Sequence, residues 1–61
     1  MAATGELIRL INYVDDITTT LRRISASIPG MEDEECKRLA EHLREASTAL
    51  TSVVTRLEKG N

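Results

Sequence analysis

Hydrophobic residues recur every three and four positions along two stretches of the chain, and a single Pro-Gly pair separates these stretches. This spacing places the apolar side chains on one side of an α-helix. Because the pattern repeats every seven residues, the two helices are typical of partners in a coiled coil. The first stretch carries Leu7, Leu10, Val14, Ile17, Leu21, Ile24 and Ile28, and the second carries Cys36, Leu39, Leu43, Ala46, Leu50, Val53 and Leu57.

The two repeats match each other when the chain reverses direction at Pro29-Gly30. Their apolar residues then meet in layers with no slip in register: Leu7 with Val53, Leu10 with Leu50, Val14 with Ala46, Ile17 with Leu43, Leu21 with Leu39, and Ile24 with Cys36. We therefore predict an all-α fold, an antiparallel helical hairpin in which these residues and Leu57 form the core. Residues 1–61 are expected to make one domain.

Local signals predict where the first helix begins and ends. Thr4 suits the N-cap, and Glu6 in the first turn complements the positive end of the helix dipole. The first helix is therefore expected to cover residues 4–27. Ile28 precedes proline, and a residue in that position is biased away from helical backbone angles, so residues 28–31 are expected to form the turn.

The second helix is expected to cover residues 32–59. It opens with four consecutive acids, Glu32 to Glu35, which favour the positive N-terminal end of a helix. Gly60 follows its last turn, and glycine is the residue that most often ends a helix. Each helix would then be about 35 to 40 Å long at 1.5 Å per residue.

The residues beside the apolar seam predict self-association. Several of them are apolar or small, where an isolated pair of helices would carry Glu and Lys. A chain of 61 residues normally needs disulfides, metal or oligomerisation for stability, and one cysteine cannot form an internal disulfide. We expect a homo-oligomer, with a dimeric four-helix bundle as the first choice. The predicted contact residues between copies are Ile8, Ile11, Tyr13, Ala49 and Val54.

Charge and hydropathy limit the partners. The net charge is −2, whereas a general nucleic-acid binder normally carries a positive excess, so nucleic acid is not the expected partner. No apolar run approaches the roughly 20 residues of a membrane span, and no signal peptide is visible. The single free cysteine fits a reducing compartment. We therefore expect a cytoplasmic protein without a membrane partner.

Candidate chemical groups are few and scattered. Cys36 falls at a core position, where it acts as a small hydrophobe. His42 follows it by six residues, whereas helical metal ligands need spacings of three or four. Glu41 and Glu45 share a helix face, but neither has a histidine at metal-ligand spacing, so they are interpreted as solvated. We expect no catalytic residues, no metal site and no cofactor, and therefore no enzyme activity.

The length of the chain, the turn near its midpoint and the heptads on both sides of it resemble the Rop family of plasmid RNA-binding regulators. That resemblance implies two hairpins paired into a four-helix bundle. The RNA-binding face of the family combines an aromatic residue with Asn, Gln and Lys. The corresponding surface here has Asn12 and Tyr13, together with Asp15 and Asp16.

Three functional hypotheses follow from these patterns. The first is a non-enzymatic, self-associating hairpin that serves as a protein–protein interaction, assembly or regulatory module. The second is an RNA- or nucleic-acid-binding regulator of the Rop kind. The third is a small inhibitor or ligand sponge of the type that phages and plasmids encode, since the stretch 44–51 resembles the Arg-Glu-x-Ser helix of phage proteins that sequester cyclic nucleotides.

Overall fold

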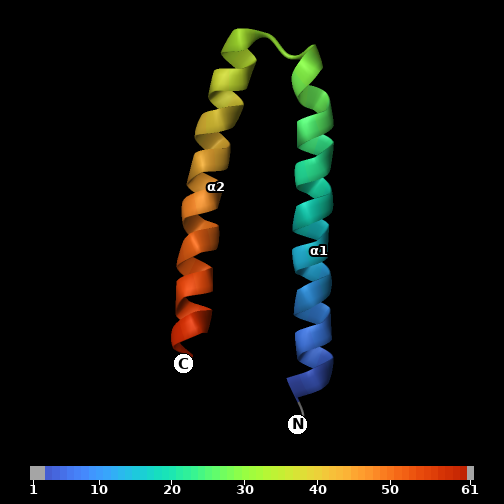
Figure 1. The fold of residues 1–61 in the computed structure, drawn as a ribbon, viewed down its shortest axis with the longest axis vertical. Helices are drawn as coiled ribbons and strands as arrows, with labels where there is room; N and C mark the ends of the chain where they lie inside the picture. The colour runs from blue at the N-terminus through green and yellow to red at the C-terminus, as the bar shows by residue number, and fades with distance from the viewer. Residues whose placement is uncertain (1–2, 61) are drawn as a thin grey trace. The chain divides into compact units, whose positions relative to one another are not determined.

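The chain forms two long α-helices joined by a short 3-10 segment (Figure 1). The computed structural model describes residues 3–60, with side chains from Gly5 to Gly60. Helix α1 spans Ala3–Ser27, η1 spans Ile28–Gly30 and α2 spans Asp33–Lys59. Residues 3–60 contain no β-strand, so the predicted all-α class is confirmed. The antiparallel pairing of the helices and the four-helix bundle stay predictions.

Helix α1 begins at Ala3, one residue before the expected start. The side chain of Thr4, the expected N-cap, lies outside the described residues. Glu6 lies in the first turn and forms an ion pair with Arg9, one turn further along the same helix. This pair adds to the favourable interaction of Glu6 with the helix dipole.

Three consecutive threonines at 18–20 lie inside α1 without interrupting it. Threonine is a weaker helix former than alanine by a few tenths of a kcal/mol. The hydroxyl of Thr18 donates a hydrogen bond to the backbone oxygen of Val14, at 3.3 Å. This bond satisfies the hydroxyl within the helix itself, so the side chain does not compete with the backbone ladder.

The first helix ends where the sequence predicts, at Ser27, whose hydroxyl donates to the carbonyl oxygen of Arg23 at 3.1 Å. Pro29 has no backbone N–H, so the α-helical ladder cannot continue through it, and the chain tightens into η1. Gly30 does not have a positive φ. A Cβ atom at Gly30 would meet nothing within 4 Å. The turn therefore depends on proline more than on glycine.

Helix α2 begins at Asp33, one residue later than expected, because Glu32 is its N-cap with an extended backbone (φ −82°, ψ 159°). The backbone N–H of Glu32 donates to the carboxylate of Glu35 at 3.0 Å. The backbone N–H of Cys36 donates to the carbonyl oxygen of Glu32 at 2.9 Å. The acidic run therefore supplies a cap as well as charge at the positive end of the helix dipole.

The end of α2 agrees with its prediction. Arg56 and Lys59 lie in the last turn, where positive charge complements the helix dipole. Gly60 is the C-cap with φ at 73°, and its N–H donates to the carbonyl oxygen of Leu57 at 3.1 Å. Among the described residues, Gly60 alone has a positive φ, a conformation that favours glycine.

Candidate interaction surface

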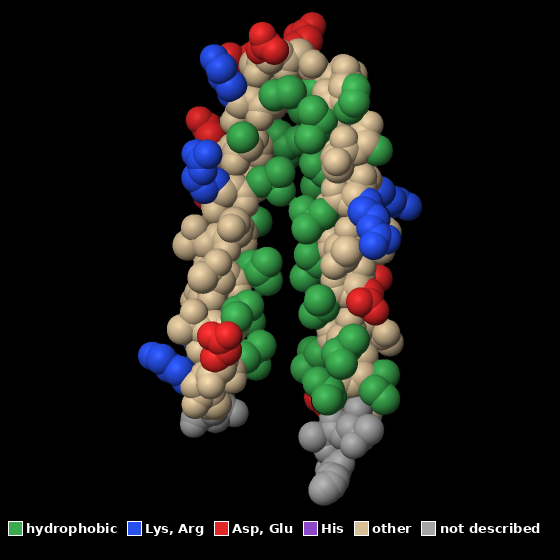
Figure 2. Space-filling view, viewed as in Figure 1, with side chains coloured by type: hydrophobic (Ala, Val, Ile, Leu, Met, Phe, Trp, Pro, Cys, Tyr) green, Lys and Arg blue, Asp and Glu red, His purple; other side chains and the backbone are tan. Residues whose placement is uncertain are grey.

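Hydrophobic side chains form a continuous strip along one side of each helix, and charged side chains lie mainly elsewhere (Figure 2). Not one of the side chains between Gly5 and Gly60 is buried. The large exposed hydrophobic residues are Leu7, Ile8, Leu10, Ile11, Tyr13, Val14, Ile17, Leu21, Ile28, Leu50, Val53, Val54 and Leu57. Contiguous apolar surface of this kind marks a site of interaction with another helix or protein.

The predicted core residues lie on one side of their own helix, as their spacing requires. On α1 these are Leu7, Leu10, Val14, Ile17, Leu21 and Ile24, and on α2 they are Cys36, Leu39, Leu43, Ala46, Leu50, Val53 and Leu57. Ile24, Cys36, Leu39 and Leu43 are half-buried, and the others are exposed. Which of these residues contact each other across the two helices stays a prediction.

The apolar strip on α1 is much wider in the N-terminal half than in the C-terminal half. At about 100° per residue, the arc from Tyr13 through Leu10 and Leu7 to Ile8 covers roughly 220° of the helix. One heptad after Ile8 the same position holds Asp15, and two heptads after it the position holds Arg22. By the same measure, Ile17, Leu21 and Ile24 cover only about 60°, within the roughly 100° of an ordinary amphipathic stripe.

Helix α2 shows a corresponding change near its C-terminal end. The ten residues 46–55 include no charged residue on any side of the helix. Ala49 and Val54 widen the strip in this segment, and Val54 is 43% exposed. The small residues of segment 46–55, which include Ala46 and Ala49, would allow another helix to approach closely.

Three hydroxyl groups of the described helices bond to the backbone of their own helix. Thr48 donates to the carbonyl oxygen of Arg44 at 3.2 Å, in the same way as Thr18 and Ser27 on α1. These hydroxyls are therefore satisfied within their own helix. Sequence reasoning did not find these bonds or the Glu6–Arg9 pair, although Glu and Arg three residues apart on a helix are a usable signal.

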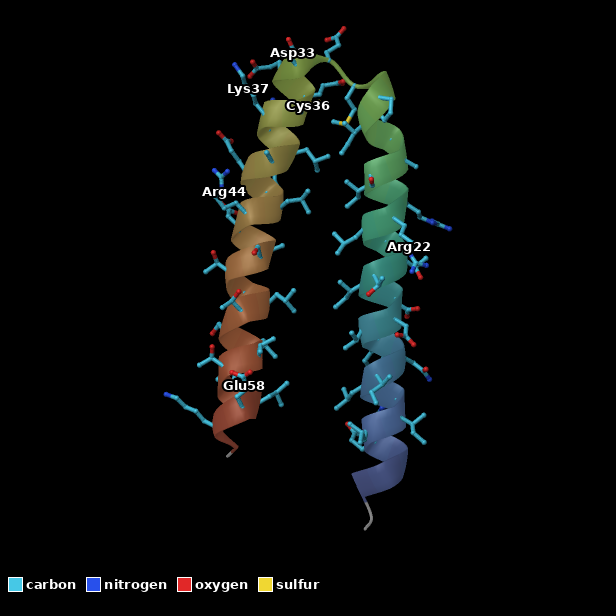
Figure 3. All side chains as sticks on the ribbon, in the orientation of Figure 1. Arg22, Asp33, Cys36, Lys37, Arg44 and Glu58 are labelled. Carbon is cyan, nitrogen blue, oxygen red and sulfur yellow. The ribbon has the colours of Figure 1, made fainter. Side chains whose placement is uncertain are left out.

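Charged groups on α2 lie away from its apolar strip. Lys37 and Arg44 extend from the side of α2 opposite its apolar side chains, and Arg22 does the same on α1 (Figure 3). Cys36 is half-buried and belongs to the strip. Most charged residues therefore lie on a solvated outer face of each helix, whereas Glu6 shares the heptad position of Tyr13 at the edge of the strip.

Two classes of site have no candidate in the part of the chain that the structure describes. Its His, Cys, Asp and Glu side chains form no group of three that could hold a metal ion. Neither of its helices contains an apolar stretch long enough to span a membrane.

The chain matches no protein-family model, and no curated protein or solved structure is significantly similar to it. The function is therefore argued from the apolar strips.

Proposed function

We propose that this protein is a non-enzymatic helical module of the cytoplasm that associates with itself and acts in assembly or regulation through protein–protein contact. The observation that carries the proposal is the exposed apolar strip on each helix. Leu57, Tyr13 and Ile8 are 74%, 55% and 56% exposed. Covering such side chains with another apolar surface is favourable by roughly 25 cal/mol per Å².

The charges on α1 support nucleic-acid binding less well than they support self-association. On α1, phosphate contacts would depend on Arg9, Arg22 and Arg23. Arg9 is paired with Glu6. Asp15 and Asp16 lie two turns before Arg22 and Arg23 on the same helix. These carboxylates would repel a phosphate backbone, which binds proteins chiefly through uncompensated positive charge.

Sedimentation equilibrium of the full chain at tens of micromolar tests the proposal, with far-UV circular dichroism to follow helix content. We expect at least a dimer at this concentration. Ile11→Glu, beside the seam, should weaken association more than Asn12→Glu, on the outer face. A wild-type chain that is fully helical and monomeric at tens of micromolar would overturn the proposal.

A further inference from the structure

The width of the apolar strip indicates how many neighbours each part of α1 needs. One packed helix covers an apolar stripe of about 100°. From Ile17 onwards the apolar residues of α1 cover about 60°, so one neighbouring helix is sufficient there. Between Leu7 and Val14 the strip covers roughly 220°, which is more than twice as wide. The N-terminal half of α1 therefore requires two neighbours, and the predicted hairpin supplies only one of them.

The two edges of this wide region differ in polarity. One edge is polar, because it carries the hydroxyl of Tyr13 and the ion pair of Glu6 and Arg9. The other edge consists of Ile8 and Ile11, which are 56% and 49% exposed and carry no polar side-chain atoms. An interface is driest at its centre and most polar at its rim. The Ile8–Ile11 edge therefore has the character of an interface centre.

We infer that the Ile8–Ile11 edge of α1 is the surface on which a second copy of this chain docks. The inference rests on the proposed self-association and assigns it to one side and one half of α1. Most oligomers of a single chain have twofold symmetry, in which the same patch contributes from both copies. Each dimer would then contain two Ile8 and two Ile11 side chains in its contact.

The charge of the candidate surfaces favours a second copy over a charged partner. The segment 5–14 carries Glu6 and Arg9, which are bound to each other, and the segment 46–55 carries no charge. A basic, acidic or nucleic-acid partner would find in these two segments only charges that already pair with each other. Uncharged apolar surface is complementary to a further copy of itself, because neither side has to desolvate an unpaired ion.

Side-chain size gives a second reason. The segment 7–14 of α1 is bulky and presents Ile8 and Ile11, whereas the segment 46–55 of α2 contains Ala46, Ala49 and two serines. Large side chains on one helix pack well where the facing helix carries small ones. Ala46 faces Val14 in the predicted hairpin, whereas Ile8 and Ile11 lie outside the predicted layers. These two bulky side chains are therefore available to α2 of a second copy, where Ala49 lies beside the seam.

A test of this inference can use Thr18 as a control position for Ile11. Ile11 and Thr18 occupy the same heptad position on α1, one repeat apart, and both side chains are exposed. Ile11→Thr exchanges one β-branched residue for another of similar helix propensity, so the variant should keep its helix content. The double variant Ile11→Thr with Thr18→Ile keeps the composition and moves the isoleucine into the half of α1 where the strip is narrow.

Dimer dissociation constants from sedimentation velocity over a concentration series give the readout. Each dimer loses two isoleucines in Ile11→Thr, so we expect about a hundred-fold weaker association, roughly ten-fold for each site. The double variant should be as weak as Ile11→Thr. Near-UV circular dichroism gives a second signal, because Tyr13 is the single aromatic residue of the chain, and its band should weaken with dissociation.

The outcomes separate the inference from the proposed function. A monomeric wild-type chain overturns both. A dimeric wild type whose dissociation constant changes less than two-fold in Ile11→Thr overturns the inference alone. A double variant that regains wild-type affinity also overturns it, because total hydrophobicity would then matter and position would not.

Discussion

Replacement of Leu21 by alanine tests the predicted seam directly. Leu21 is 45% exposed in the described chain, and the predicted pairing places it against Leu39. Leucine to alanine removes three carbon atoms, and each buried carbon contributes about 0.8 kcal/mol, which gives roughly 2.4 kcal/mol if pairing covers the side chain. A residual cavity raises the expected cost to about 2 to 4 kcal/mol.

Thr19→Ala provides the matched control on the outer face of the same turn. Alanine has the higher helix propensity, by about 0.2 kcal/mol over leucine and about 0.5 kcal/mol over threonine. Local propensity alone would therefore leave both variants as stable as the wild type or slightly more stable. Only loss of packing can make Leu21→Ala destabilising, so the sign of its effect separates the two contributions.

Urea denaturation followed by far-UV circular dichroism, at one fixed protein concentration, measures both variants. We expect Leu21→Ala to lower the free energy of unfolding by about 2 to 4 kcal/mol and Thr19→Ala to leave it equal or slightly higher. Equal effects at Leu21 and Thr19 would refute the heptad assignment. A loss below about 1 kcal/mol at Leu21 would mean that the side chain stays in water in the folded protein.

Two further predictions concern the turn and the outer face. Gly30→Ala should raise the free energy of unfolding by about 0.4 to 1 kcal/mol in the same denaturation assay, since Gly30 lacks a positive φ and a Cβ has free space there; a destabilised variant would contradict this. The chain should not bind mixed RNA hairpins or duplex DNA in a fluorescence titration at about 150 mM salt. Micromolar binding that disappears when Arg22 and Arg23 are both replaced by alanine would instead support an RNA-binding regulator.

Much of the fold was predictable because helices depend on interactions close in sequence. Backbone hydrogen bonds join residues four apart, and the apolar repeat follows the same period. The last residue of α1, Ser27, could therefore be predicted from Pro29, which lacks the N–H that the next turn needs. The end of α2 at Lys59 followed from Gly60 for a different reason, because glycine adopts the positive φ that ends a helix. The self-association residues were chosen from heptad positions alone, and they stay a prediction.

The sequence by itself determined the two helices, the break between them and the side of each helix that is apolar, because each of these depends on residue type and spacing along the chain. The structure decided how polar groups at particular positions are satisfied. Glu35 binds the backbone of Glu32, Arg9 pairs with Glu6, and the hydroxyl of Thr18 turns back to Val14. These choices depend on side-chain rotamers and on backbone angles at the helix ends, where several hydrogen-bond partners compete within about 1 kcal/mol of one another. Only three-dimensional geometry selects among them, and it also shows that Gly30 does not use the conformational freedom of glycine, whereas Gly60 does.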